Sequence, residues 1–290
     1  MKGTKLVMLG LAAVMTAGAF AAAGCKPATT PAAEEKPALS GSITVEGSDT
    51  MVNLAQAWAE KFQEANPGVM VSVKGGGSGN GIAALINGTV DFADASRGMK
   101  DEEKTQATAA GVTPVEAAVA LDGICVVVNP ANGVTNLSVE QLGKIYRGEI
   151  TNWKDAGGAD KAIVLLGRDT SSGTYEYFKE EVVGKEKEYA KSMRNLASTQ
   201  AIVDEVKGND AAIGYVGIGY AANAGAEVKL VQLENIEPTI ATVADGSYPL
   251  SRSLFMYSNG APEGVAKAYL DWILADGQGV VEEQGFVKIN

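Results

Sequence analysis

The sequence IVLLGRDTSSGTYEYF, residues 163–178, decides the fold because its residue pattern changes from that typical of a strand to that of a loop and then to that of a helix. Residues 163–166 form a short apolar run typical of a buried strand, and residues 167–173 end it with glycines and hydroxyl side chains. From Thr174 onward, aromatic and aliphatic side chains recur at helical spacing. Arg168 stands directly ahead of the hydroxyls. This stretch therefore predicts a turn that presents small hydrogen-bond donors and one positive charge at the start of a helix.

The same order of strand, small-residue loop and helix occurs twice nearer the N-terminus. The two copies are a strand at 42–46, a loop at 47–50 and a helix that ends before Asn66, and then a strand at 69–73, the loop KGGGSGNG at 74–81 and a short helix at 82–87. A helix start presents unpaired backbone N–H groups, glycine allows close approach, and Ser and Thr add donors without bulk. For any one loop, the commoner explanation is that its Ser, Thr or Asp only caps the helix. Three such loops, one of which carries an arginine suited to oxyanions, favour an anion site.

Composition removes several classes of function. Lys+Arg is 24 against Asp+Glu 35, a net charge of −11, which disfavours nucleic acid and anionic lipid as ligands. There is no histidine, so serine–histidine and cysteine–histidine catalysis are excluded. The loop at 74–81 lacks the Lys-Ser/Thr of a nucleotide P-loop, and the match of residues 79–84 to a dinucleotide motif is weak. We expect no metal and no cofactor.

The first 40 residues are predicted to be an export signal and a tether. Lys2 and Lys5 precede an uncharged apolar run, and Ala-Ala-Gly-Cys at 22–25 resembles the cleavage site of bacterial lipoproteins. We expect residues 1–24 to be a signal peptide, Cys25 to carry lipid, and residues 25–40 to be a tether. The alternative is an ordinary signal with an incidental Cys25. Cys125, in an apolar run, is expected to be a buried free thiol.

Seven motifs together resemble the periplasmic phosphate-binding proteins of ABC transporters. They are GSDTM (47–51), GGGSGNGI (75–82), DFADASRGM (91–99), GEITNW (148–153), GRDTSSGTYEYF (167–178), AIGYVGIGY (212–220) and GSYPLSRSLFMY (246–257). The resemblance implies an α/β fold of the type II-like periplasmic binding proteins, with two lobes, a hinge and a ligand cleft between them. It implies that residues 41–120 and 245–290 form the first lobe and residues 121–244 the second. Closure of the lobes around the ligand is the expected motion.

The resemblance also implies which residues bind phosphate. Carried over by motif, the expected site is Ser48, Asp49, Thr50, Ser78, Ser96, Arg97, Arg168, Ser172, Gly173 and Thr174. Some members of the family carry an aspartate where this chain has Ser96, and that carboxylate accepts the proton of hydrogen phosphate. An acceptor of this kind rejects sulfate, which has no proton to offer. We hypothesise that Asp49 supplies the acceptor here, or alternatively that it caps a helix at 50–65. Asp94 is a second candidate for the acceptor.

The function implied is a binding module without catalysis. We expect a monomer that is exported and lipid-anchored at the outer face of the cytoplasmic membrane or in the periplasm, and that delivers inorganic phosphate to a membrane permease. One alternative is a receptor for sulfate, molybdate or a phosphonate. Another is an exported phosphatase with Ser172 or Thr174 as nucleophile, although it would need a base or metal ions. A third is a lipoprotein that senses phosphate without transport.

Overall fold

The computed structural model describes residues 38–289. The predicted signal peptide, Cys25 and most of the predicted tether lie outside these residues. Between residues 38 and 289, no helix is both long enough and apolar enough to cross a membrane.

The described residues alternate between strands and helices, as the sequence predicts. The strands are β1 (Ser40–Gly47), β2 (Gly68–Lys74), β3 (Phe92–Ala95), β4 (Pro114–Val128), β5 (Asn136–Leu137), β6 (Val164–Arg168), β7 (Arg194–Leu196), β8 (Ala212–Gly217), β9 (Lys229–Leu233) and β10 (Ser251–Asn259). The α-helices are α1 (Val52–Ala65), α2 (Ser78–Ile86), α3 (Asp101–Ala109), α4 (Val139–Tyr146), α5 (Gly173–Phe178), α6 (Thr199–Gly208), α7 (Ile218–Ala224), α8 (Ile240–Ala244), α9 (Gly264–Leu274) and α10 (Gln278–Glu283). Three further turns of helix are η1 (Trp153–Ala156), η2 (Lys179–Gly184) and η3 (Gly225–Glu227).

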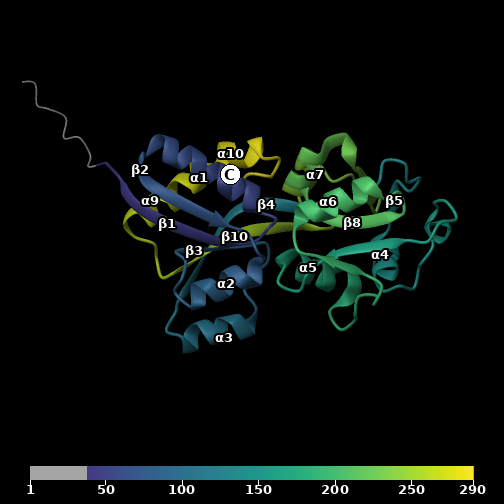
Figure 1. The fold of residues 1–290 in the computed structure, drawn as a ribbon, viewed down its shortest axis with the longest axis horizontal. Coiled ribbons are helices and arrows are strands. Elements are labelled where there is room, and N and C mark those ends of the chain that lie inside the picture. The colour runs from purple at the N-terminus through teal and green to yellow at the C-terminus, as the bar shows by residue number, and fades with distance from the viewer. Residues whose placement is uncertain (1–37, 290) are drawn as a thin grey trace, which may run out of the picture. The chain divides into compact units, whose positions relative to one another are not determined.

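One strand, β4, joins the two halves of the sheet. Its first part pairs with β10 as far as Gly123, and from Ile124 onward it pairs with β8 and β9. The strand order along the sheet is β2-β1-β3-β10-β4-β8-β6-β7. We call the half with β1, β2, β3 and β10 the first lobe and the half with β5 to β9 the second lobe (Figure 1). The lobe boundaries expected from the sequence stay a prediction.

The core follows from the periodicity of the sequence. In α1 the residues Leu54, Trp58 and Phe62 are buried and lie four residues apart, so they share one face of the helix. Phe62 meets Tyr269 of α9 with ring centroids 5.0 Å apart, so α9 packs against α1 in the first lobe. Figure 1 shows α1, α9 and α10 on one side of this half of the sheet and α2 and α3 on the other. Cys125 is a buried free thiol in β4, as expected.

One element boundary differs from the prediction. The helix expected at 82–87 begins at Ser78 and ends at Ile86, because the second half of the glycine-rich loop is already helical. Glycines have a low intrinsic helix propensity, so local sequence did not predict this early start. Strand β10 begins at Ser251, within the motif at 246–257. Tyr248 instead lies in the preceding turn and donates its hydroxyl to the Ile124 carbonyl oxygen.

Candidate functional site

Six of the predicted site residues carry hydroxyl groups, and all six are buried. None is more than 3% exposed; they are Ser48, Thr50, Ser78, Ser96, Ser172 and Thr174. The first four lie where β1, β2 and β3 lead into the next element, and the last two flank the start of α5. Because β1, β2 and β3 are parallel, their carboxyl ends meet at one edge of the first lobe.

Five of these side chains form a connected set, which we call the hydroxyl cluster: Ser48, Thr50, Ser78, Ser96 and Thr174. The Oγ of Ser96 lies 3.0 Å from Ser48 Oγ and 3.3 Å from Ser78 Oγ. Thr174 Oγ1, from the second lobe, lies 2.8 Å from Thr50 Oγ1 and 3.5 Å from Ser96 Oγ. A hydroxyl both donates and accepts, so members that pair with each other here can also turn to a ligand.

Gly173 allows the two lobes to come close together at the cluster. A Cβ at this position would lie 2.4 Å from Ser78 Oγ and 2.8 Å from Ser96 Oγ. Real atoms do not approach so closely, so only glycine lets the start of α5 reach these two serines. Next to Gly173, a backbone hydrogen bond joins the two lobes: Gly79 N donates to the Ser171 carbonyl oxygen over 3.0 Å. The structure therefore brings Gly173 to the hydroxyl cluster.

Arg168 and Asp49 form an ion pair between the lobes. The Arg168 side chain is 1% exposed, and its Nη2 donates to Asp49 Oδ2 over 2.6 Å. Its other side-chain bonds go to the second lobe: the carbonyl oxygens of Leu196 and Ala197 and the Thr199 hydroxyl. The buried Arg168 side chain is thus held in the second lobe by three hydrogen bonds, and a fourth joins it to Asp49 of the first lobe.

Asp49 does not cap the first helix, so that alternative for its role is wrong. Helix α1 begins at Val52, after the N-cap residue Met51, and has no side-chain cap. The second carboxylate oxygen of Asp49, Oδ1, instead accepts from Gly76 N over 3.2 Å. A carboxylate can accept about four hydrogen bonds, and these contacts use two of them. Asp49 therefore keeps acceptor capacity at the interface of the lobes.

Arg97 is not brought into the hydroxyl cluster. Its guanidinium forms a two-pronged pair with Glu103, over 2.8 Å and 2.6 Å, and also donates to the Gly98 carbonyl oxygen. Glu103 in turn accepts from Lys100 N at the start of α3. The side chain of Arg97 therefore tightens the loop before α3, although Ser96 next to it joins the cluster.

Asp94, the second candidate for the proton acceptor, faces the core of the first lobe. Along β3, Phe92 and Asp94 share a face, and Phe92 packs against Tyr269 of α9. Neither Asp94 Oδ1 nor the Tyr269 hydroxyl has a hydrogen-bond partner among residues 38–289. Burial raises the pKa of the Asp94 carboxyl to about 8. This position argues against a direct role for Asp94 on the anion.

Arg252 belongs to the site, although sequence reasoning missed it. It lies in β10 opposite Asp122 of β4 and pairs with that carboxylate through Nε at 3.0 Å and Nη2 at 2.7 Å. Nη2 also donates to Thr174 Oγ1 over 2.9 Å, and Nη1 to the Ser96 carbonyl oxygen over 2.8 Å. The available signal was an arginine inside the apolar strand motif GSYPLSRSLFMY, where a charge needs a partner.

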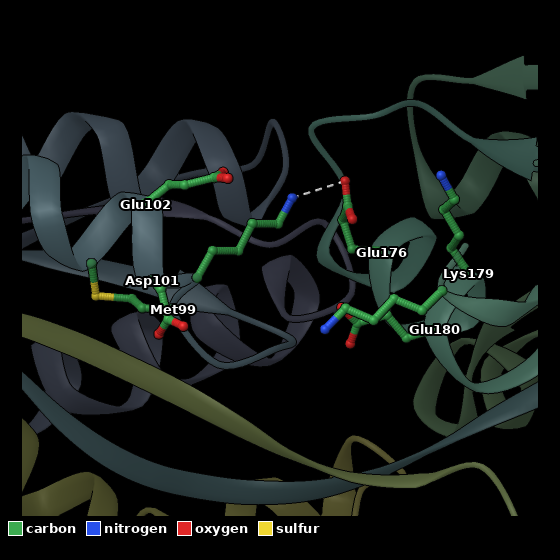
Figure 2. A pocket seen from close by; sticks show the side chains of 8 residues that line it. Met99, Asp101, Glu102, Glu176, Lys179 and Glu180 are labelled. Carbon is green, nitrogen blue, oxygen red and sulfur yellow. Dashed lines mark ion pairs between the residues drawn. The ribbon is translucent and has the colours of Figure 1, made fainter. Parts of the chain in front are cut away.

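A charged pocket of about 420 Å³ lies outside this site. Figure 2 shows its lining, which comes from the start of α3 and from α5 and η2: Met99, Lys100, Asp101, Glu102, Glu176, Lys179, Glu180 and Lys185. Lys100 Nζ lies 3.0 Å from Glu176 Oε1, a second ion pair between the lobes (Figure 2). Both side chains are partly exposed, and such pairs contribute about 0–1 kcal/mol. The buried Arg168–Asp49 pair is therefore the more important electrostatic contact across the cleft.

The chain is similar to known binding proteins over most of its length. A model for the PBP superfamily domain matches residues 32–277. The phosphate-binding protein PstS of Bacillus subtilis (strain 168) is 33% identical over 295 residues, covering 100% of this chain and 95% of that protein. The phosphate-binding protein PstS of Staphylococcus saprophyticus is 36% identical over 260 residues, covering 86% of this chain and 81% of that protein.

Solved structures show the same arrangement. A putative phosphate ABC transporter substrate-binding protein with bound phosphate from Clostridium perfringens superposes with a TM-score of 0.80 at 31% identity, covering 86% of this chain and 100% of the other. An ABC-type phosphate transport receptor from Vibrio cholerae superposes with a TM-score of 0.69 at 32% identity, covering 84% and 99%. These likenesses confirm the predicted two-lobed α/β fold.

Proposed function

This chain belongs to the PBP superfamily, and from that membership we propose that it binds inorganic phosphate outside the cytoplasmic membrane and delivers it to an ABC-type phosphate importer. The observation that carries the proposal is the hydroxyl cluster, to which both lobes contribute buried donors. A tetrahedral oxyanion offers many acceptor lone pairs to such a set, and hydroxyls from facing lobes can hold it from opposite sides.

Because the arginines at the site are paired with carboxylates, we infer that an anion is recognised by the directions of hydrogen bonds rather than by net charge. Arg168 is paired with Asp49 and Arg252 with Asp122, so each guanidinium at the site has its own carboxylate. An anion is then held mainly by hydroxyl and backbone donors, whose positions match a particular geometry. This supports a selective receptor, and it is compatible with the acidic composition of the chain.

We infer that the protein performs no catalysis. A phosphatase using Ser172 or Thr174 would need a general base or metal ions to activate the hydroxyl. Ser172 Oγ accepts from Tyr175 N, and Thr174 Oγ1 accepts from Arg252, and among residues 38–289 neither hydroxyl bonds to a carboxylate or amine base. A group that donates to a hydroxyl oxygen cannot take up its proton, so neither of these contacts supplies the base.

The position at the membrane is also part of the proposal. The relatives are substrate-binding proteins of transporters, which supports an exported location. We propose that lipid on Cys25 anchors the chain at the membrane and that it works as a monomer beside the permease. The motif at 22–25 is the support for the anchor.

The test is calorimetric titration of the purified, anion-stripped protein with phosphate and then sulfate at matched ionic strength. Tight binding of phosphate with no heat from sulfate is the expected result. Binding of neither anion would contradict the proposed function, and equal binding of both would make the protein a general oxyanion receptor.

Replacing Asp49 by asparagine is expected to lower the phosphate-to-sulfate affinity ratio by about tenfold or more. A carboxylate only accepts hydrogen bonds, so it can bind the proton of hydrogen phosphate but has no favourable contact with sulfate. An amide can also donate a hydrogen bond to sulfate. The ratio is measured by the same titrations. Asp210→Asn is the matched control, because Asp210 also lies 2.6 Å from its cationic partner, Lys161, but on the exposed surface. An unchanged ratio in Asp49→Asn would exclude Asp49 as the selective acceptor.

A further inference from the structure

The pair formed by Arg252 and Asp122 is the most deeply buried ion pair near the site. The two side chains are 2% and 0% exposed and stand opposite each other on β10 and β4, where β4 leaves the first lobe. Asp122 Oδ1 also accepts from Ile218 N at the start of α7. Burial raises the pKa of the Asp122 carboxyl, and the charge and hydrogen bonds of Arg252 oppose that shift. A buried pair with this many bonds is a rigid element at the junction of the lobes.

Arg252 extends from this pair to both lobes. Its guanidinium donates to the Ser96 carbonyl oxygen in the first lobe and to Thr174 Oγ1 in the second. It also lies over the Tyr177 ring, 5.5 Å from the centroid. The Asp122 carboxylate holds the arginine so that these contacts are kept at fixed positions.

The contact with Thr174 has a consequence for the direction of hydrogen bonds. A guanidinium has donors and no acceptor, so Thr174 Oγ1 must accept from Arg252. The single hydrogen of the Thr174 hydroxyl then cannot point at Arg252. It is left for the other neighbours, which are Thr50, Ser96 or a bound anion.

Two other hydroxyls are directed in the same way, but by the backbone. Ser78 Oγ accepts from Ser96 N over 3.0 Å, and Ser172 Oγ accepts from Tyr175 N over 3.3 Å. Thr174 differs because a side chain directs it, and that side chain is anchored in the junction between the lobes. The direction of this one donor therefore depends on a residue that can be substituted.

We propose that Arg252, held by Asp122, is a positioning residue that fixes the Thr174 hydroxyl as a hydrogen-bond donor to the bound tetrahedral oxyanion. This inference rests on the proposed function and deepens it. Arg252 acts through Thr174, so its effect on binding depends on the presence of the Thr174 hydroxyl.

The test is a cycle of substitutions read out by phosphate titration. Arg252→Lys keeps a positive charge beside Asp122, but an ammonium group cannot reproduce the fork that reaches Asp122 and Thr174 together. Arg252→Lys and Thr174→Val are each expected to weaken phosphate binding about tenfold, the usual scale for one charge-assisted hydrogen bond. The double variant is expected to bind as weakly as Thr174→Val alone. Thr174→Ser, which keeps the hydroxyl, is expected to bind nearly normally and to remain sensitive to Arg252→Lys.

A purely structural role for Arg252 predicts a different pattern. In that case Arg252→Lys would weaken binding by the same factor in the unaltered protein, in Thr174→Ser and in Thr174→Val. The double variant with Thr174→Val would then bind phosphate about a hundredfold more weakly than the unaltered protein. This result, in which the two free-energy changes simply add, would overturn the inference.

A second variant and a control keep the test informative. If Arg252→Lys does not fold, the combined variant Arg252→Gln with Asp122→Asn, which removes both charges, takes its place in the cycle with the same expectation. Arg194→Lys is the control, because Arg194 forms a two-pronged pair with Glu205 on the surface. Failure of the unaltered protein to bind phosphate would contradict the proposed function itself, whereas binding with an additive cycle would contradict only the role of Arg252.

Discussion

Replacing Arg168 by methionine is expected to weaken phosphate binding about 10²- to 10³-fold. Truncating one member of a buried, hydrogen-bonded charge pair costs about 2–5 kcal/mol, part of which comes from the unpaired partner. Here the partner is Asp49 of the opposite lobe, 2.6 Å away. The substitution removes a contact that holds the lobes together and leaves a negative charge beside an anion site. Both effects oppose phosphate binding, and calorimetric titration measures their sum.

Two comparisons separate this effect from a general loss of stability. Arg168→Lys keeps one positive charge for Asp49 but loses the fork that also contacts Leu196, Ala197 and Thr199, so an intermediate loss is expected. Arg194→Met removes an exposed arginine and should leave binding unchanged. Urea unfolding of the ligand-free variants shows whether the second lobe remains folded. A loss of less than about tenfold in a folded Arg168→Met protein would contradict a central role for this ion pair.

Replacing Asp94 by asparagine is expected to change the free energy of unfolding in a pH-dependent way. Between pH 5 and pH 8, the difference between the variant and the unaltered protein is expected to shift in favour of the variant by up to about 4 kcal/mol. Burial raises the pKa of Asp94 from 3.8 to about 8. Between these values the folded state keeps a proton that the unfolded state has released, so the free energy of unfolding falls as pH rises. The free energy of unfolding falls by at most about 1.4 kcal/mol per pH unit, and this fall stops above pH 8. Asparagine has a similar shape and does not titrate there, so the variant lacks this loss.

The measurement is urea unfolding of both proteins at several values between pH 5 and pH 9. Groups that titrate in both proteins cancel when the two curves are subtracted. Asp204→Asn, at an exposed position on α6, is the matched control. A pH-independent difference for Asp94→Asn would mean that the Asp94 carboxyl is solvated or paired in the folded protein.

The elements and the donor loops could be predicted from sequence because they depend on local pattern. The run of glycine and hydroxyl residues at 167–173 predicted the turn into α5, and the helical spacing of aromatic residues from Thr174 onward predicted the helix itself. Thr174 lies at the helix start that this pattern predicts, whereas Ser78 was expected in the loop and instead begins α2. The resemblance of seven motifs then predicted the fold that the structural likenesses confirm.

The roles of the charged residues required the tertiary structure. Arg97 and Ser96 are neighbours in sequence, yet one side chain pairs with Glu103 and the other joins the hydroxyl cluster. Asp94 faces the core because β3 lies between β1 and β10 with α9 packed over that face. Sequence pattern alone does not say which face of such a short strand is covered.

Arg252 is the strongest example of this difference. Its partner Asp122 is 130 residues away in the chain, and the two meet only because β10 and β4 pair antiparallel in one register. That each segment forms a strand is a property of its own sequence. Which residues face each other depends on how the two segments pair, and a shift of one residue in that pairing would put the two side chains on opposite faces of the sheet. The sequence by itself thus predicted the donors of the candidate site, and the tertiary structure decided which charged residues lie beside them.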